Sequence, residues 1–178
     1  MSFKKYIIGI SAGLALLCTT SANATTLNKL SFNEVVNQSA ACVVGKVQSV
    51  ESVTRNGQVM TLTTFSVSST AFGNVGQTVT VETAGGRSTM GRLLVNEVVA
   101  GTPRFFNNQE NLLFLSAPNA AGEYSVVGFN QGRFSVNPAG AGLVTLPINN
   151  EAELMSVDNA FSVIRAARAG SSDLTITP

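Results

Sequence analysis

The sequence predicts a mainly β fold, a small antiparallel barrel or sandwich of about seven or eight strands, with a short N-terminal helix and a longer C-terminal helix. Three observations lead to this prediction. Strand-length segments rich in Val, Thr and Phe recur along the chain, and turn signals separate them. Apolar residues at helical spacing occur in a short stretch before these segments and a long stretch after them. Asn111–Val136 holds the densest apolar run, so we expect the rest of the chain to pack around it.

Residues 1–24 have the pattern of a secretory signal peptide. Lys4 and Lys5 form the basic start, an apolar segment follows, and Ala22-Asn23-Ala24 is a small-x-small cleavage site. A lipoprotein signal, cut before Cys18, is the alternative, although Leu17 stands where such signals have a small residue. We therefore expect an exported protein, periplasmic or extracellular, with one domain over residues 25–170 and a tail over 171–178.

The charge of the mature chain bears on its partners. The two signal lysines leave 9 basic residues (11 minus 2) against 10 acidic ones, a net charge of −1. Nucleic acids and anionic membranes attract clustered Lys and Arg, so the sequence predicts neither as a partner. No second segment is long and apolar enough for a transmembrane helix. The partner expected is a protein or a small molecule.

The first half of the domain contains a helix signal and three strand patterns. Ser31 and Glu34 form a capping-box pattern for a short helix. Cys42–Val53 is a strand whose apolar phase slips after Val47, which predicts a bulge, with Gly45 nearby as the permissive residue. Asn56-Gly57 predicts a tight hairpin turn into a second strand, Val59–Phe72. In that second strand we expect Phe65, Val67 and Ala71 on one face, and Ser and Thr on a solvent face. Gln77–Thr83 alternates as a third strand.

The middle of the chain reads as loop and short strands. Ala84–Gly91 is predicted to be a Gly-rich loop, and Leu93–Val99 a strand or a short covering segment. Phe105 and Phe106 are expected to plug one end of the core. Leu112–Leu115 has no alternation, which predicts a strand covered on both faces.

The last part of the domain predicts three strands, a loop and a helix. The strands are Tyr124–Phe129, Arg133–Asn137 and Leu143–Leu146, with a Gly/Ala loop at Pro138–Gly142. Asn150–Arg168 is the predicted long helix, with Asn150 as its cap. Its apolar stripe is Leu154, Val157, Phe161 and Ile164.

Several catalytic chemistries lack their residues. The chain has no histidine, which excludes His-based triads, His general bases and His-containing zinc sites. Cys42 is the single cysteine left after signal cleavage, so an intrachain disulfide is excluded. Its apolar neighbours indicate a buried free thiol, and an intermolecular disulfide or a reactive thiol is the alternative. We expect no metal and no cofactor.

Three arginines are candidate ligand contacts. Arg87 and Arg92 flank the Gly85-Gly86 region, where backbone N–H groups and guanidinium groups could hold an anion. Arg133 follows another glycine. The competing interpretation is that the glycines make plain turns and that these arginines are ordinary surface residues. The Phe residues fall at strand positions and are expected in the core.

Six segments resemble a group of uncharacterised exported bacterial domains. They are Ala41–Val47 (ACVVGKV), the end of a Thr-rich strand at Ala71–Asn74 (AFGN), Gly85-Gly86, Gly101–Phe105 (GTPRF), Leu112–Leu115 (LLFL) and Val127–Phe134 (VGFNQGRF). The opening strand is also similar to that of netrin-like modules such as the tissue inhibitors of metalloproteinases, whose disulfide cysteines are missing here. The resemblance implies export and an OB-like β-barrel.

We therefore expect an exported, non-enzymatic binding or interaction domain. The netrin-like similarity implies an alternative, a modulator or inhibitor of an exported protease. A further alternative is an enzyme whose Ser, Thr or Glu residues come together only in the fold.

Overall fold

The computed structural model describes residues 28–90, 92–137, 142–149 and 151–170. The predicted signal peptide, the predicted tail and most of the predicted loop Pro138–Gly142 lie outside the described residues. The elements are α1 (Phe32–Gln38), β1 (Ala41–Arg55), β2 (Gln58–Phe72), β3 (Thr78–Ala84), β4 (Gly86–Met90), β5 (Leu93–Glu97), β6 (Glu110–Leu115), the 3₁₀ helix η1 (Phe129–Gly132), β7 (Arg133–Asn137), β8 (Leu143–Ile148), β9 (Glu151–Ser156) and α2 (Val157–Arg168).

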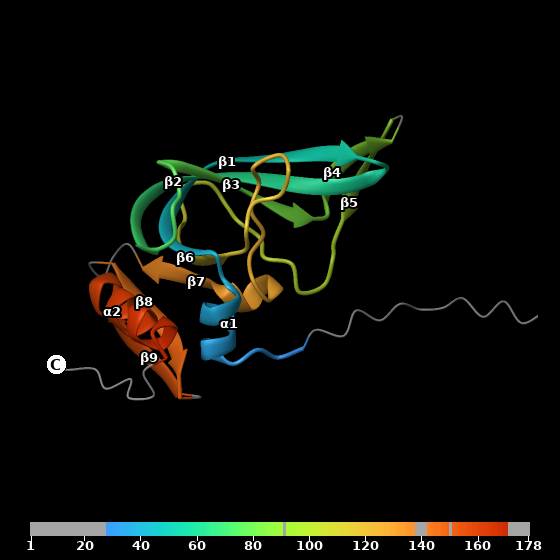
Figure 1. Ribbon diagram of the computed structural model, residues 1–178. Helices are drawn as coiled ribbons and strands as arrows, with labels where there is room; N and C mark the ends of the chain where they lie inside the picture. Colours follow the sequence, from blue (N-terminus) through green and yellow to red (C-terminus); the bar gives the residue numbers. More distant parts are fainter. Residues whose placement is uncertain (1–27, 91, 138–141, 150, 171–178) are drawn as a thin grey trace, which may run out of the picture.

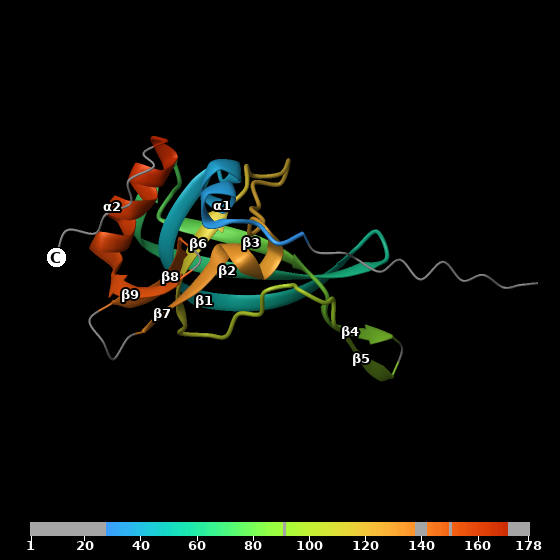
Figure 2. The same ribbon diagram turned by 90° about the horizontal axis from the view of Figure 1, so that it is seen from below.

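The predicted mainly β, antiparallel fold with two helices is confirmed. Seven strands form one sheet in the order β3-β2-β1-β6-β7-β8-β9, and β4 and β5 form a separate two-stranded sheet. The β4–β5 hairpin and α2 lie at opposite ends of the molecule (Figures 1 and 2). The named strands do not close into a barrel, because β3 and β9 are the two edges of the large sheet. A count of seven or eight strands is too low for the described residues, which form nine.

The bulge predicted in the first strand is present. The β1–β2 register shifts between Val47 and Ser49, which moves the later residues of β1 to the other face. Gly45 leaves room for the partner strand, because a Cβ there would lie 3.2 Å from both the Phe65 Cβ and the Ser66 carbonyl oxygen. The predicted hairpin turn is also confirmed, with positive φ at Asn56 and Gly57.

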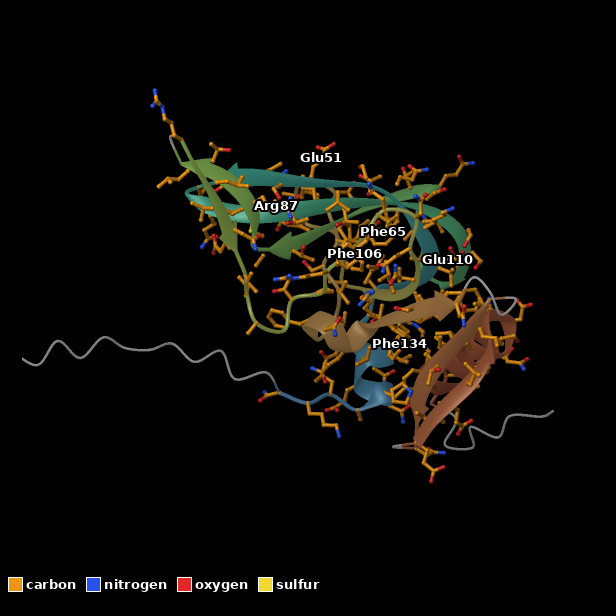
Figure 3. All side chains as sticks on the ribbon, turned by 180° about the vertical axis from the view of Figure 1, so that it is seen from behind. Glu51, Phe65, Arg87, Phe106, Glu110 and Phe134 are labelled. Carbon is orange, nitrogen blue, oxygen red and sulfur yellow. The ribbon has the colours of Figure 1, made fainter. Side chains whose placement is uncertain are left out.

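Two apolar clusters lie on the two faces of the sheet. The inner cluster contains Val43, Val47, Phe65, Val79, Val81, Phe105, Leu113, Leu115 and Val126. The helix-side cluster contains Cys42, Val44, Leu112, Phe114 and residues of α1, α2, β7, β8 and β9. Phe65 belongs to the first cluster, and Phe134 packs against the second beside α1 (Figure 3). Leu112–Leu115 is fully buried, as predicted, because alternate residues enter the two clusters.

The segment after β6 differs from the prediction. Tyr124–Phe129 is not a regular strand, but its first residues form single bridges to two strands. Leu115 pairs with Val126 in the antiparallel sense, and Val81 of β3 pairs with Tyr124 in the parallel sense. The chain then turns into η1, with positive φ at Gly128 and Phe129. This segment therefore joins β6 to β3 without forming a ladder of its own.

Two strands replace parts of a predicted loop and a predicted helix. Gly86–Met90 is β4, because it pairs with β5 although it is rich in glycine and polar residues. Glu151–Ser156 is β9, because it pairs along its length with β8. The helix therefore begins later than predicted, with Ser156 as its N-cap, and Leu154 is exposed outside the apolar stripe. In the described part of the chain, no helix is long and apolar enough to cross a membrane.

Candidate binding site beside the β4–β5 hairpin

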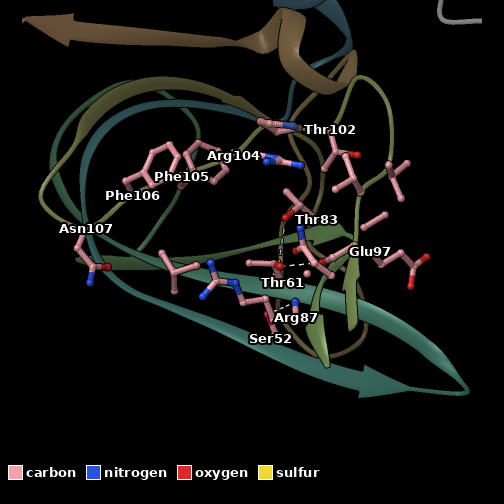
Figure 4. Close-up of a pocket in the computed structure, with 18 residues that line it drawn as sticks. Ser52, Thr61, Thr83, Arg87, Glu97, Thr102, Arg104, Phe105, Phe106 and Asn107 are labelled. Atoms are coloured by element: carbon pink, nitrogen blue, oxygen red, sulfur yellow. Dashed lines mark hydrogen bonds between the residues drawn. The ribbon is translucent and has the colours of Figure 1, made fainter. Parts of the chain in front are cut away.

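A cavity of about 410 Å³ lies between the distal half of the β1–β2 hairpin, the base of the β4–β5 hairpin and the loop before β6 (Figure 4). We call it the hairpin cavity. Val50, Ser52 and Thr61 form one wall, and residues 85–87 and 96–99 form a second. Residues 102–107 form the third wall. Three segments that are distant in the sequence therefore meet at one opening.

The polar wall follows from the register of β2. Thr61, Thr63 and Phe65 are two residues apart and therefore share a face of the strand. Phe65 belongs to the inner cluster, Thr63 is fully buried, and Thr61 lines the hairpin cavity. The Ser/Thr face that was expected to see solvent is the opposite face of the strand, where Thr64, Ser66, Ser68 and Thr70 are half-buried or exposed. The inner face is apolar at Phe65 and becomes polar toward the hairpin tip.

The Gly85-Gly86 pair makes a tight chain connection. Both residues have positive φ, and a Cβ on Gly86 would lie 2.6 Å from Thr61 Oγ1 and 2.7 Å from Ser52 Oγ. The Gly85 N–H donates to the Val59 carbonyl (2.8 Å), and the Arg87 N–H donates to Ser52 Oγ (3.0 Å). These amides already have partners inside the fold, so the geometry favours the plain turn over an anion site made of backbone N–H groups.

Two guanidinium groups at the hairpin cavity have no acidic partner. Arg87 extends from β4, and Arg104 comes from the opposite wall (Figure 4). Among the described residues, neither side chain forms a hydrogen bond or an ion pair, and the carboxylate of Glu97 is directed away from both. Arg55 is different, because it is paired with Glu82 and Glu123. Positive charge without compensation therefore lies at this cavity.

Arg92 and Arg133, the other two predicted contacts, lie elsewhere. Arg92 is exposed at the turn of the β4–β5 hairpin and does not line the cavity. Arg133 is half-buried, its Nε donates to Asn111 Oδ1 (3.0 Å), and its guanidinium lies 5.4 Å from the ring centre of Phe105. Burial lowers the pKa of Arg133, but an arginine keeps its charge at any ordinary pH. The structure therefore separates the three arginines.

Cys42 is a buried free cysteine. Its side chain is fully covered within the helix-side cluster, and burial raises the pKa of the thiol. A thiol in these surroundings reacts slowly because the thiolate, which is the nucleophile, is disfavoured. Its position matches the prediction of a buried free thiol and gives no support to an intermolecular disulfide.

Arg104 and Phe106 are cavity residues that sequence reasoning missed. Phe105 is buried in the inner cluster, where its ring packs edge-on against Phe65, with 5.0 Å between centroids. Phe106 lines the cavity and is 62% exposed, so only one of the two rings plugs the core. Both Phe106 and Arg104 lie in a polar loop, and the resemblance that covers Gly101–Phe105 gives Arg104 no role. Their one signal is the clustering of aromatic and basic residues in a loop.

No group of three or more Cys, Asp and Glu residues that could hold a metal ion occurs within the described ranges. Comparisons with protein-family models, with curated proteins and with solved structures find no match for this chain. The assignment of function therefore rests on the geometry of the hairpin cavity.

Proposed function

We propose that this protein is an exported, non-enzymatic binding domain that takes an anionic ligand in the hairpin cavity. The observation that carries the proposal is that Arg87 and Arg104 line one cavity while neither has an acidic partner in the described part of the chain. Export rests on the signal-peptide pattern of residues 1–24.

The chemistry of the walls favours a carboxylate or phosphate. A guanidinium group binds either anion through paired N–H donors, and such charge-assisted hydrogen bonds are stronger than neutral ones. The hydroxyls of Ser52 and Thr61 line the same cavity, and the exposed ring of Phe106 offers an apolar surface at its rim. Ser52 and Thr61 already take part in hydrogen bonds that hold residues 85–87, which suits a binding wall better than a nucleophile.

We also propose that β1, β2, β3, β6 and the segment after β6 form an OB-type barrel. The supporting hydrogen bonds run on both sides of that segment. Tyr124 donates to the Thr80 carbonyl (2.9 Å) and accepts from the Glu82 N–H (2.8 Å). On the other side, Ser116 donates to the Ser125 carbonyl (2.9 Å) and Val127 donates to the Phe114 carbonyl (2.9 Å). OB-type barrels bind ligands on the face of their second and third strands, and the hairpin cavity adjoins the same two strands here.

Calorimetric titration with glutarate and with inorganic phosphate tests the binding proposal. Arg87→Gln and Arg104→Gln are each expected to weaken binding roughly tenfold or more, because each removes charge-assisted hydrogen bonds worth about 1.5–3 kcal/mol. Arg92→Gln is the matched control, since it removes the same charge from a residue outside the cavity. Absence of binding for both probes, or equal losses in all three variants, would overturn the proposal.

A further inference from the structure

A second cavity lies next to the hairpin cavity. It measures about 480 Å³, and we call it the edge cavity. The two cavities share Thr83, Ala84, Thr102 and Pro103, so they meet at the end of β3. The apolar lining of the edge cavity comes from Leu30, Met60, Ala84, Pro103, Val126 and Phe129. One cavity therefore carries two arginines, and its neighbour is mainly apolar.

Phe129 holds an apolar ring at the edge cavity in an uncommon backbone conformation. Its φ is 59°, a left-handed value that is rare for a bulky residue, and its side chain is 41% exposed. The neighbouring chain is fixed by Gln131, which accepts from the Leu30 N–H (2.8 Å) and donates to the Asn28 carbonyl (2.9 Å). Strained residues that persist are frequent at ligand sites.

The backbone of β3 alternates between its two neighbours. The Thr80 carbonyl and the Glu82 N–H point toward Tyr124, whereas the Gly85 N–H points toward Val59 of β2. The same alternation along β3 directs the Glu82 carbonyl and the Ala84 N–H away from β2. Within the described ranges, Val81–Tyr124 is the bridge on this edge, and no strand pairs with the edge beyond it. The end of β3 therefore presents backbone groups of the kind that an added strand binds.

Side chains at this end of β3 point alternately to the two faces of the strand, and both cavities adjoin it. Thr83 follows Val81 of the inner cluster by two residues and lies where the two cavities meet. Glu82 points to the opposite side and lines the edge cavity together with Met60. An extended peptide beside β3 would alternate in the same way, with successive side chains entering different cavities. Strand addition uses this arrangement, in which the backbone supplies affinity and alternate pockets supply specificity.

We infer that the ligand is an extended peptide segment that adds to the free end of β3, with an acidic side chain in the hairpin cavity and an adjacent apolar side chain in the edge cavity. This inference rests on the proposed function, because it uses the same two arginines. Charge decides which side chain enters which cavity. Arg87 and Arg104 attract a carboxylate, whereas Glu82 and the apolar lining disfavour one in the edge cavity.

Binding of fluorescein-labelled peptides, followed by anisotropy, tests the inference. The probe is a nine-residue Ser/Thr peptide with a central Glu-Leu pair, and the control peptides carry Gln-Leu or Glu-Ser. We expect each control peptide to bind roughly tenfold more weakly, because each lacks the side chain that would enter one of the two cavities. Met60→Gln should weaken the Glu-Leu peptide and leave the Glu-Ser peptide unchanged.

Ala84→Pro and a backbone N-methylated probe test strand addition itself. Proline removes the Ala84 N–H, which points away from β2, so the variant should fold and lose the peptide by roughly tenfold. Because Ala84 also lines the hairpin cavity, glutarate affinity is measured on the same variant, and the peptide should lose more affinity than glutarate does. N-methylation of the probe at Leu removes a donor from the ligand and tests the same contact on the unaltered protein. If both changes leave peptide affinity intact while glutarate binds, strand addition is wrong and the anion site stands. If neither glutarate nor any peptide binds, the proposed function fails as well.

Discussion

Glu123 joins three parts of the fold through its carboxylate. It accepts hydrogen bonds from Nη1 (2.6 Å) and Nη2 (2.7 Å) of Arg55 at the end of β1 and from Nδ2 of Asn119 (3.2 Å) in its own loop. Arg55 also contacts Glu82 of β3, at 3.1 Å. The hydrogen bonds from Arg55, followed by that from Asn119, lower the pKa of Glu123 to about 2.

The free energy of unfolding should therefore fall in acid. A carboxylate with a lowered pKa in the folded state stabilises the fold fully above its unfolded pKa, near 4.5, and loses that contribution as the pH falls toward 2. Urea unfolding at pH 7, 5, 4 and 3 should show this decline. Glu123→Gln should be less stable at pH 7 and should lose less of its stability on acidification. The pKa of Glu34 is also lowered, so the free energy of unfolding of the variant will still fall somewhat in acid. Parallel declines in both proteins would contradict the assignment.

At the residue scale, the sequence predicted core positions better than site positions. The burial of Cys42 and of Leu112–Leu115 follows from their apolar neighbours. Arg104 could not be found in this way, because its role depends on a loop that folds over a distant hairpin. Thr63 is a hydroxyl residue, a type that is usually exposed, but its place two residues from Phe65 puts it on the inner face, where it is buried. Chemical type alone does not decide the face of a strand.

At the element scale, β9 and α2 replace one predicted helix. Glu151 and Glu153 have good helix propensity and would suit the first turn of a helix, which is why the sequence favoured a start at Asn150. Pairing with β8 overrides that local preference from Ile148↔Glu151 to Leu143↔Ser156. β4 was missed for the related reason that its partner strand, rather than its composition, makes it a strand.

Ser156 should be the residue that stabilises the start of α2. Its hydroxyl accepts from the Asn159 N–H (3.3 Å), as an N-cap does. We expect Ser156→Ala to lower the free energy of unfolding by about 1 kcal/mol, measured by urea denaturation. Ser162→Ala is the matched control, because that exposed hydroxyl bonds the Asp158 carbonyl within the helix. Equal losses in the two variants would contradict this helix start.

At the scale of the whole molecule, the two ends of the fold differ in how their apolar side chains are packed. The helix-side cluster joins α1, α2 and the strands β6–β9 into a packed layer. The opposite end exposes Leu93 and Leu94 on the β4–β5 hairpin, and Val98 and Phe106 at the cavity that Arg87 and Arg104 line. The sequence predicted the class of fold and both helices, because apolar periodicity reports burial directly. It did not predict the cavities, because they form between segments that are far apart along the chain.

The central claim is that an anion binds in the hairpin cavity between Arg87 and Arg104. Titration of ¹⁵N-labelled protein with glutarate, followed by the backbone amide and arginine Nε–Hε signals in NMR spectra, tests it most directly. We predict saturable shifts at Ser52, Thr61, Arg87, Thr102 and Arg104, with the Nε–Hε signals of Arg92 and Arg133 unchanged. Shifts centred on Arg92 or Arg133, or no saturable shift at the cavity residues, would contradict the claim.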